Sequence, residues 1–267
     1  MLDFITQSPA LAGLGAGLVT WLCTSLGAGA VFLKQEFSRK TLDMLLGFAG
    51  GVMLAASVWS LLDPALALAE PGWGAWKFVP PAGGFLLGAL SLRLLDYATP
   101  HFHMMLARPD GPKSALPRNF LLVLAITLHN IPEALAVGVA FGAAALDPSL
   151  GLAGALTLMF GIGLQNVPEG MAVSLPLLRD GMKRSKAFCI GQLSGAVEPV
   201  AALVGALLTS LALSVLPWAL GFAAGAMIFV TVEEVIPEAH ASGNGDAATM
   251  GVIIGFVTMM CLDVVFS

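Results

Sequence analysis

The stretch LHNIPEALAVGVA, Leu128 to Ala140, places a histidine, an asparagine, a proline and a glutamate inside a long apolar run. The whole chain is 57% hydrophobic and 11% charged, and its mean hydropathy is +0.88. Soluble domains carry about 25% charged residues. The composition therefore predicts an integral membrane protein. A single transmembrane domain is expected over residues 1–267, with no room for a separate soluble domain.

Apolar runs long enough to cross a bilayer recur along the chain. A spanning helix needs roughly 20 apolar residues, and barrel strands alternate apolar and polar positions instead. The runs here are continuous, so we predict an all-α polytopic membrane protein with eight transmembrane helices. The predicted spans are about 10–33, 42–63, 79–97, 119–143, 150–178, 187–212, 217–239 and 247–266.

The basic residues indicate how these helices are oriented. All but one lie in the loops after spans one, three and five or at the end of span three: Lys34, Arg39, Lys40, Arg93, Arg108, Lys113, Arg118, Arg179, Lys183, Arg184 and Lys186. Only Lys77 lies on the other side. The positive-inside rule makes these loops cytoplasmic and both termini extracytoplasmic. The N-terminus has no basic region or cleavage site of a signal peptide, so we expect the first span to be retained.

The opening motif recurs in the next span. HNIPEALAVG at 129–138 and QNVPEGMAVS at 165–174 share Asn, Pro, Glu, Ala and Val in one register. Consecutive spans run in opposite directions, so the two copies are expected to face each other as inverted repeats. Many carriers build their substrate site near the membrane centre in this way.

Each copy presents three polar side chains on one helix face, because residues three and four apart lie together. They are His129, Asn130 and Glu133 from span four, and Gln165, Asn166 and Glu169 from span five. A third glutamate, Glu198 in GQLSGAVEPV, lies at similar depth in span six. Pro132 and Pro168 each remove a backbone donor, which can free the carbonyl of Leu128 or Leu164 as a further ligand.

These buried glutamates need a positive partner. An ionised carboxylate at mid-bilayer costs about 3 kcal/mol even on lenient scales, and three close together repel one another. No lysine or arginine lies at their depth, so protons or metal ions remain. Imidazole, amide and carboxylate groups suit Zn²⁺ and similar divalent ions, and the lack of a cysteine cluster argues against Cu(I). We predict a two-metal site bridged by Glu133 and Glu169.

The paired motifs, followed by GQLSGAVEPV in a chain of eight spans, resemble the ZIP family of divalent metal transporters, in particular its prokaryotic GufA-like branch. The resemblance covers essentially the full length. It implies a binuclear metal site between spans four, five and six. One ion would be held by His129, Glu133, Gln165 and Glu169, and the other by Asn130, Glu133, Asn166, Glu169 and Glu198.

Span two, FAGGVMLAASVWSLLDP, also resembles the family pattern and would bring Met53 and Ser60 near the first ion. Ala134 stands where the family often has glycine, and Gln165 stands where many members have histidine. The second departure leaves the ion preference open.

The end of span seven, VEEVIPEAH, would form a cytoplasmic release station as in the family, with Glu234 facing inward. Its residues are Glu233, Glu234, Glu238 and His240.

Other residues have weaker predicted roles. Asp63 and Asp263, near outer span ends, would attract cations at the entrance. His101 and His103 would collect or sense metal in a cytoplasmic loop, as the resemblance suggests. Glycines spaced four residues apart, Gly47/Gly51, Gly84/Gly88, Gly221/Gly225 and Gly251/Gly255, are predicted packing surfaces that also permit a homodimer. Cys23, Cys189 and Cys261 are predicted to be small buried apolar residues.

The expected function is uptake of a divalent metal ion toward the cytoplasm across the cell membrane, with Zn²⁺ as substrate and Cd²⁺, Fe²⁺ and Mn²⁺ as possible substrates. The resemblance implies alternating access, with spans one, four, five and six rocking against the rest. No enzyme activity and no nucleic-acid partner are expected. Two alternatives remain: a proton-coupled carrier of a small organic substrate, and an intramembrane metalloenzyme, against which the absence of HExxH argues.

Overall fold

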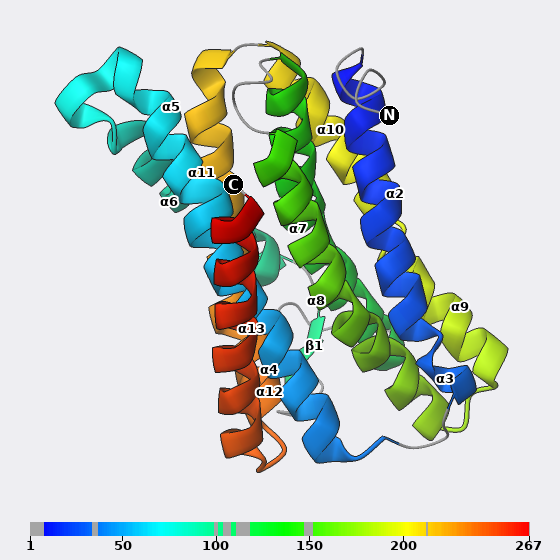
Figure 1. The fold of residues 1–267 in the computed structure, drawn as a ribbon. Helices are drawn as coiled ribbons and strands as arrows, with labels where there is room; N and C mark the ends of the chain where they lie inside the picture. Colours follow the sequence, from blue (N-terminus) through cyan, green and yellow to red (C-terminus); the bar gives the residue numbers. More distant parts are fainter. Residues whose placement is uncertain are drawn as a thin grey trace.

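The computed structural model describes residues 8–33, 37–98, 101–103, 108–110, 118–146, 152–211 and 213–266. Long helices dominate these ranges (Figure 1). Six helical segments are long and apolar enough to cross a membrane: Pro9–Leu33, Arg39–Trp76, Ile126–Ala145, Arg184–Thr209, Leu216–His240 and Gly245–Phe266. The predicted all-α membrane class is confirmed at this level.

The helices follow the predicted spans closely. In chain order they are α2 (Pro9–Ala28), α3 (Ala30–Leu33), α4 (Arg39–Ala56), η1 (Ser57–Leu62), α5 (Asp63–Trp73), η2 (Gly74–Trp76), α6 (Val79–Ala98), α7 (Arg118–Leu146), α8 (Leu152–Arg179), α9 (Arg184–Ser194), α10 (Glu198–Leu211), η4 (Leu213–Val215), α11 (Leu216–Val230), η5 (Thr231–Val235), α12 (Ile236–His240) and α13 (Gly245–Phe266). Helices α6 and α8 have 20 and 28 residues, which is also sufficient length to span a bilayer.

A short antiparallel ribbon lies between α6 and α7. Its strands are β1 (His101–His103) and β2 (Arg108–Asp110), and β1 packs against α7. The backbone of His101 and His103 therefore forms a strand, while their side chains lie outside the described residues. Their predicted role in collecting metal stays a prediction.

Span two is longer than predicted. The expected helix over 42–63 continues to Trp76, past Pro64. The π-helical segment η1 ends two residues before this proline, and the amide of Asp63 donates to the carbonyl of Val58, five residues back. Because proline lacks the amide that an α-helix would use, the wider turn lets the helix continue.

Span six is broken, although we predicted one helix over 187–212. Helix α9 ends at Ser194 and α10 begins at Glu198 after a turn. Pro199 cannot donate to the carbonyl of Gly195, and the amide of Glu198 donates to it instead, at 2.9 Å. The break therefore follows from the proline, and it places Glu198 in the first turn of a new helix.

The four glycine pairs are packing surfaces, as predicted, and they match one another reciprocally. The pairs of α4 and α13 lie against each other's backbone, and the pairs of α6 and α11 do the same. A Cβ at any of these eight positions would meet the backbone of the partner helix. Small residues allow such close approach where no hydrophobic effect drives helices together.

The helices form two groups (Figure 1). The first group contains α2, α7, α8, α9 and α10, and the second contains α4, α6, α11 and α13. Contacts between α4 and α8 and between α7 and α11 join them. This division agrees with the expected separation of spans one, four, five and six from the rest. Both repeated motifs belong to the first group.

The prediction that all three cysteines are buried is wrong for two of them. Cys23 is partly buried, whereas Cys189 and Cys261 are exposed on the surface of the chain. In a membrane protein, apolar character extends around the whole helix, so a small apolar residue does not by itself indicate a buried face.

Candidate metal-binding site

The repeated motifs lie side by side in α7 and α8, which contact each other. Both helices continue through their internal prolines, Pro132 and Pro168. The polar side chains of the motifs are almost completely buried, with exposed fractions of 0% for Asn130, Gln165 and Asn166, 1% for Glu133 and 6% for Glu169. These groups therefore point into the protein rather than into lipid.

Six buried oxygen atoms of the motifs have no hydrogen-bond partner among the described residues. They are Asn130 Oδ1, Glu133 Oε1 and Oε2, Gln165 Oε1, Asn166 Oδ1 and Glu169 Oε2. Leaving a buried polar group unpaired costs about 1–3 kcal/mol. All six atoms are acceptors of the kind that can ligate a cation, and the Gln165 amide nitrogen beside Glu133 is also without a partner among the described residues.

The amide nitrogens of two motif residues are fixed by the protein. Asn130 Nδ2 donates to the carbonyl of Ser194 at 3.0 Å, and Asn166 Nδ2 donates to Glu198 Oε2 at 2.8 Å. The Ser194 carbonyl lies at the end of α9, where the break in span six leaves it without a helical partner. Each nitrogen is thus committed, which leaves the amide oxygen as the free ligand atom.

Glu198 differs from the other two glutamates. It is 1% exposed, and both of its oxygens accept hydrogen bonds. Thr24 Oγ1 of α2 donates to Oε1 at 2.7 Å, and Asn166 supplies the second bond. Thr24 was absent from our sequence-based site, because a threonine in an apolar span is usually bonded to its own helix and carries no distinctive signal.

His129 connects the two helix groups. Its Nε2 lies 2.7 Å from Oε1 of Glu234, which belongs to η5 of the second group. His129 also interacts electrostatically with Glu169 of the neighbouring motif. His129, a predicted ligand of the first ion, and Glu234, a predicted residue of the release station, therefore lie in direct contact.

The carboxylates lie near one another but do not form a closed cage. Glu133 interacts electrostatically with Glu169 and Glu198. Among the residues that the structure describes, no three His, Cys, Asp or Glu side chains are arranged to hold an ion by themselves. The amide oxygens of Asn130, Gln165 and Asn166 would have to complete a ligand set.

Comparison with known proteins assigns the family. Residues 108–263, which include both motifs and Glu198, match the family model described as ZIP Zinc transporter. The chain belongs to the ZIP zinc transporter family. It is 42% identical to the zinc transporter ZIP11 of Xenopus tropicalis, over 96% of this chain and 98% of the relative.

Two bacterial relatives of the ZIP family are similarly close. Identity is 42% with the zinc transporter GufA of Myxococcus xanthus, over 94% of this chain and 98% of the relative. It is also 42% with the zinc transporter ZIPB of Bordetella bronchiseptica, over 92% of this chain and 79% of the relative. The resemblance to the ZIP family and its GufA-like branch is confirmed.

Span two of this ZIP protein carries Met53 and Ser60, whose predicted places near the first ion stay predictions. Met53 is completely buried, and its sulfur lies 3.5 Å from Thr231 Oγ1, whose proton is donated to the Met227 carbonyl at 2.7 Å. The Ser60 hydroxyl donates to Asp263 Oδ1 at 2.7 Å rather than to a glutamate of the motifs. Asp263 is buried and interacts with exposed Asp63, so the two outer acids lie near each other.

The residues of the predicted release station differ in exposure and in their contacts. Glu233 is exposed, and Glu238 is partly buried on α12. The ring nitrogens of His240 lie 2.8 Å from the Ile236 carbonyl and 3.0 Å from Thr249 Oγ1. Glu234 of this predicted set pairs with the motif residue His129.

Two π-helical segments were missed by sequence reasoning. Segments η1 and η5 each end two residues before a proline, Pro64 and Pro237. The dipeptides Asp63-Pro64 and Ile236-Pro237 could have signalled a disturbed helix. Segment η5 carries Glu234, the residue that contacts His129. π-bulges of this kind are frequent at functional sites.

Proposed function

We propose that this ZIP family member moves Zn²⁺, or a similar divalent ion, inward across the cell membrane. The observation that carries this proposal is the set of six buried oxygens of α7 and α8 without hydrogen-bond partners among the described residues. Carboxylate and amide oxygens of this kind complement a divalent cation. The ion is the transported substrate, so its binding has to be reversible.

The proposed site holds two ions. Glu133 and Glu169 bridge them, His129 and Gln165 complete the first, and a second set of residues completes the other: Asn130, Asn166 and Glu198. Three carboxylates against two divalent cations leave a net charge of about +1, which a buried site tolerates better than three unpaired negative charges. Met53 of the second group is completely buried and is proposed as a further ligand of the first ion.

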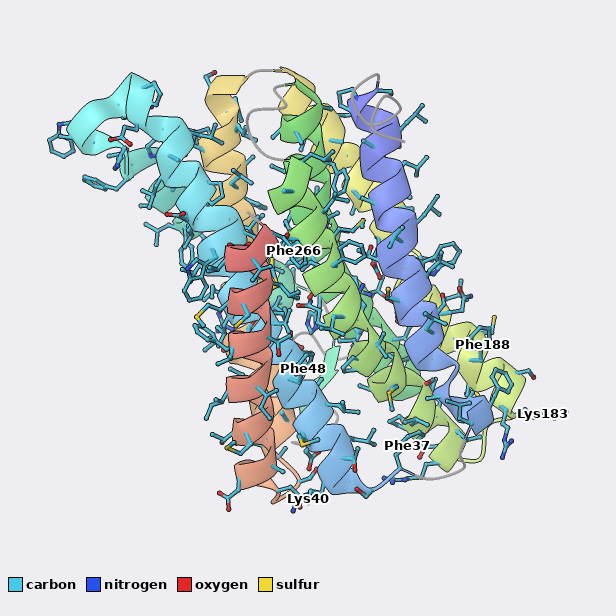
Figure 2. The ribbon with its side chains drawn as sticks, in the orientation of Figure 1. Phe37, Lys40, Phe48, Lys183, Phe188 and Phe266 are labelled. Carbon is cyan, nitrogen blue, oxygen red and sulfur yellow. The ribbon has the colours of Figure 1, made fainter. Side chains whose placement is uncertain are left out.

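The proposed topology has eight spans, with α6 and α8 added to the six most apolar segments. Figure 2 places Lys40 and Lys183 at the same end of the molecule, and Figure 1 shows α2 beginning and α13 ending toward the other end. By the positive-inside rule, the end with the lysines is cytoplasmic and both termini are extracytoplasmic.

The two helix groups support a proposal of transport by alternating access. The motifs and Glu198 all belong to the first group, so the ions would travel with that group as it rocks against the second. His129 and Glu234 pair across the boundary. Glu234 is therefore the first residue of the second group that a departing ion would meet on the cytoplasmic route.

The test is zinc binding and zinc flux in purified protein. Isothermal titration and uptake into proteoliposomes are measured for the wild type and for Glu169→Ala. We expect binding and uptake in the wild type and loss of both in the variant. Glu70→Ala is the control, because Glu70 is an exposed acid paired with Lys77 on the protein surface. Wild-type uptake in Glu169→Ala, or a wild type without zinc binding, would refute the proposal.

A further inference from the structure

The carboxylate of Glu198 is held from two helices. It begins α10, where the helix N-terminus favours negative charge. Thr24 of α2 reaches one oxygen at 2.7 Å, and Asn166 of α8 reaches the other at 2.8 Å. All three residues are at most 1% exposed. The orientation of this carboxylate is therefore fixed by neutral donors inside the protein.

The Thr24 hydroxyl is directed at Glu198. Its only other acceptor among the described contacts is the carbonyl of Thr20, which lies farther away at 3.4 Å. A hydroxyl has one proton, so the shorter, charge-assisted bond takes it. Thr24 therefore does more than bond to its own helix, which is what buried threonines in apolar helices usually do.

The surroundings leave this pair little freedom to rearrange. A Cβ at Gly195 would lie 2.6 Å from Glu198 Oε1 and 2.9 Å from the side chain of Thr24, so only glycine leaves room for the contact. Gly170 of α8 packs directly against the Thr24 backbone. Helix α2 thus carries the hydroxyl at a fixed position relative to Asn166.

We propose that Thr24 is a positioning residue that orients Glu198 as a ligand of the second ion. The proposal rests on the proposed function, and it adds α2, which supplies no ligand, to the helices that shape the site. Thr24 and Asn166 each donate one hydrogen bond to the carboxylate, Thr20 also interacts with it, and a carboxylate has about four lone-pair sites, so a lone pair remains for the ion. Hydrogen bonds of this kind fix the direction of metal ligands, and their loss weakens metal binding by about 10–100-fold.

The experiment measures zinc stoichiometry and affinity by isothermal titration of detergent-purified protein. Glu198→Gln identifies which binding event belongs to the second ion. We expect Thr24→Val, which keeps the shape and removes the hydroxyl, to weaken that event by about 10–100-fold and leave the other unchanged. Thr24→Ser, which keeps the hydroxyl, should bind the second ion with wild-type affinity.

Thr209→Val is the matched control, because the buried Thr209 hydroxyl bonds the Ala206 carbonyl of its own helix. Its titration should equal that of the wild type. Unchanged second-ion binding in Thr24→Val would overturn the inference, as would equal weakening of both events or no rescue by serine. A wild type that binds no zinc would instead refute the proposed function, so the two failures are distinguishable.

Discussion

Glu133 and Glu198 are both glutamates at 1% exposure in the first helix group, yet the protein treats them in opposite ways. Neither oxygen of Glu133 has a partner in hydrogen-bond geometry in the described part of the chain, although the Gln165 side chain interacts with it, whereas both oxygens of Glu198 accept well-formed hydrogen bonds. Burial alone therefore does not define a role. We interpret Glu133 as a residue whose partner is the transported ion and Glu198 as one that the protein has already fixed in place.

The strongest test of this comparison is Glu133→Gln. The substitution should abolish zinc uptake into proteoliposomes, because it removes the negative charge that bridges both ions. It should also raise the melting temperature of zinc-free protein, since an unpaired buried carboxylate is costly. Uptake at the wild-type rate, or a lower melting temperature, would contradict our interpretation of Glu133.

Glu198→Gln should have the opposite effect on stability. Its zinc uptake should fall less than that of Glu133→Gln, because Glu198 serves one ion in the proposed site. Its melting temperature without zinc should decrease, because hydrogen bonds to a charged group contribute about 1.5–3 kcal/mol each. Thermal unfolding of the two variants side by side measures this difference in sign. If both substitutions changed the melting temperature by the same amount, the proposed difference between Glu133 and Glu198 would be wrong.

Substituting Glu234 tests whether its contact with His129, across the boundary between the helix groups, matters for transport. Glu234→Gln should slow the maximal rate of zinc uptake several-fold while zinc affinity stays close to that of the wild type. We expect the substitution to slow conformational exchange or zinc release and to leave zinc binding unaffected. Glu233→Gln, at the adjacent exposed acid, is the control and should transport normally. A matching loss in both variants would remove any special role for Glu234.

The smallest effect is expected at the outer end. Ser60→Ala removes the donor to Asp263 and should lower the free energy of unfolding by about 1 kcal/mol. Zinc affinity in the central site should not change, because this hydroxyl is committed to Asp263. A large loss of zinc affinity by titration would show that Ser60 belongs to the central site after all.

The sequence predicted the helices and the repeated motifs well, because both are local patterns. The two Asn-x-Pro-Glu motifs share one register, and helix periodicity places their polar residues on one face. The break before Glu198 was missed, although Gly195 and Pro199 flank it. A proline inside a helix pattern is also tolerated, as Pro132 and Pro168 show, so the pattern alone does not distinguish a continuous helix from a broken one.

By itself, the sequence determined that the chain is a helical membrane protein and that carboxylates enter its apolar interior. Only the tertiary structure decided which donor each carboxylate receives. Thr24 and Glu198 are 174 residues apart, and His129 meets Glu234 from the other helix group. In lipid, apolar periodicity does not specify which helices associate, so small-residue contacts and individual polar pairs make that choice.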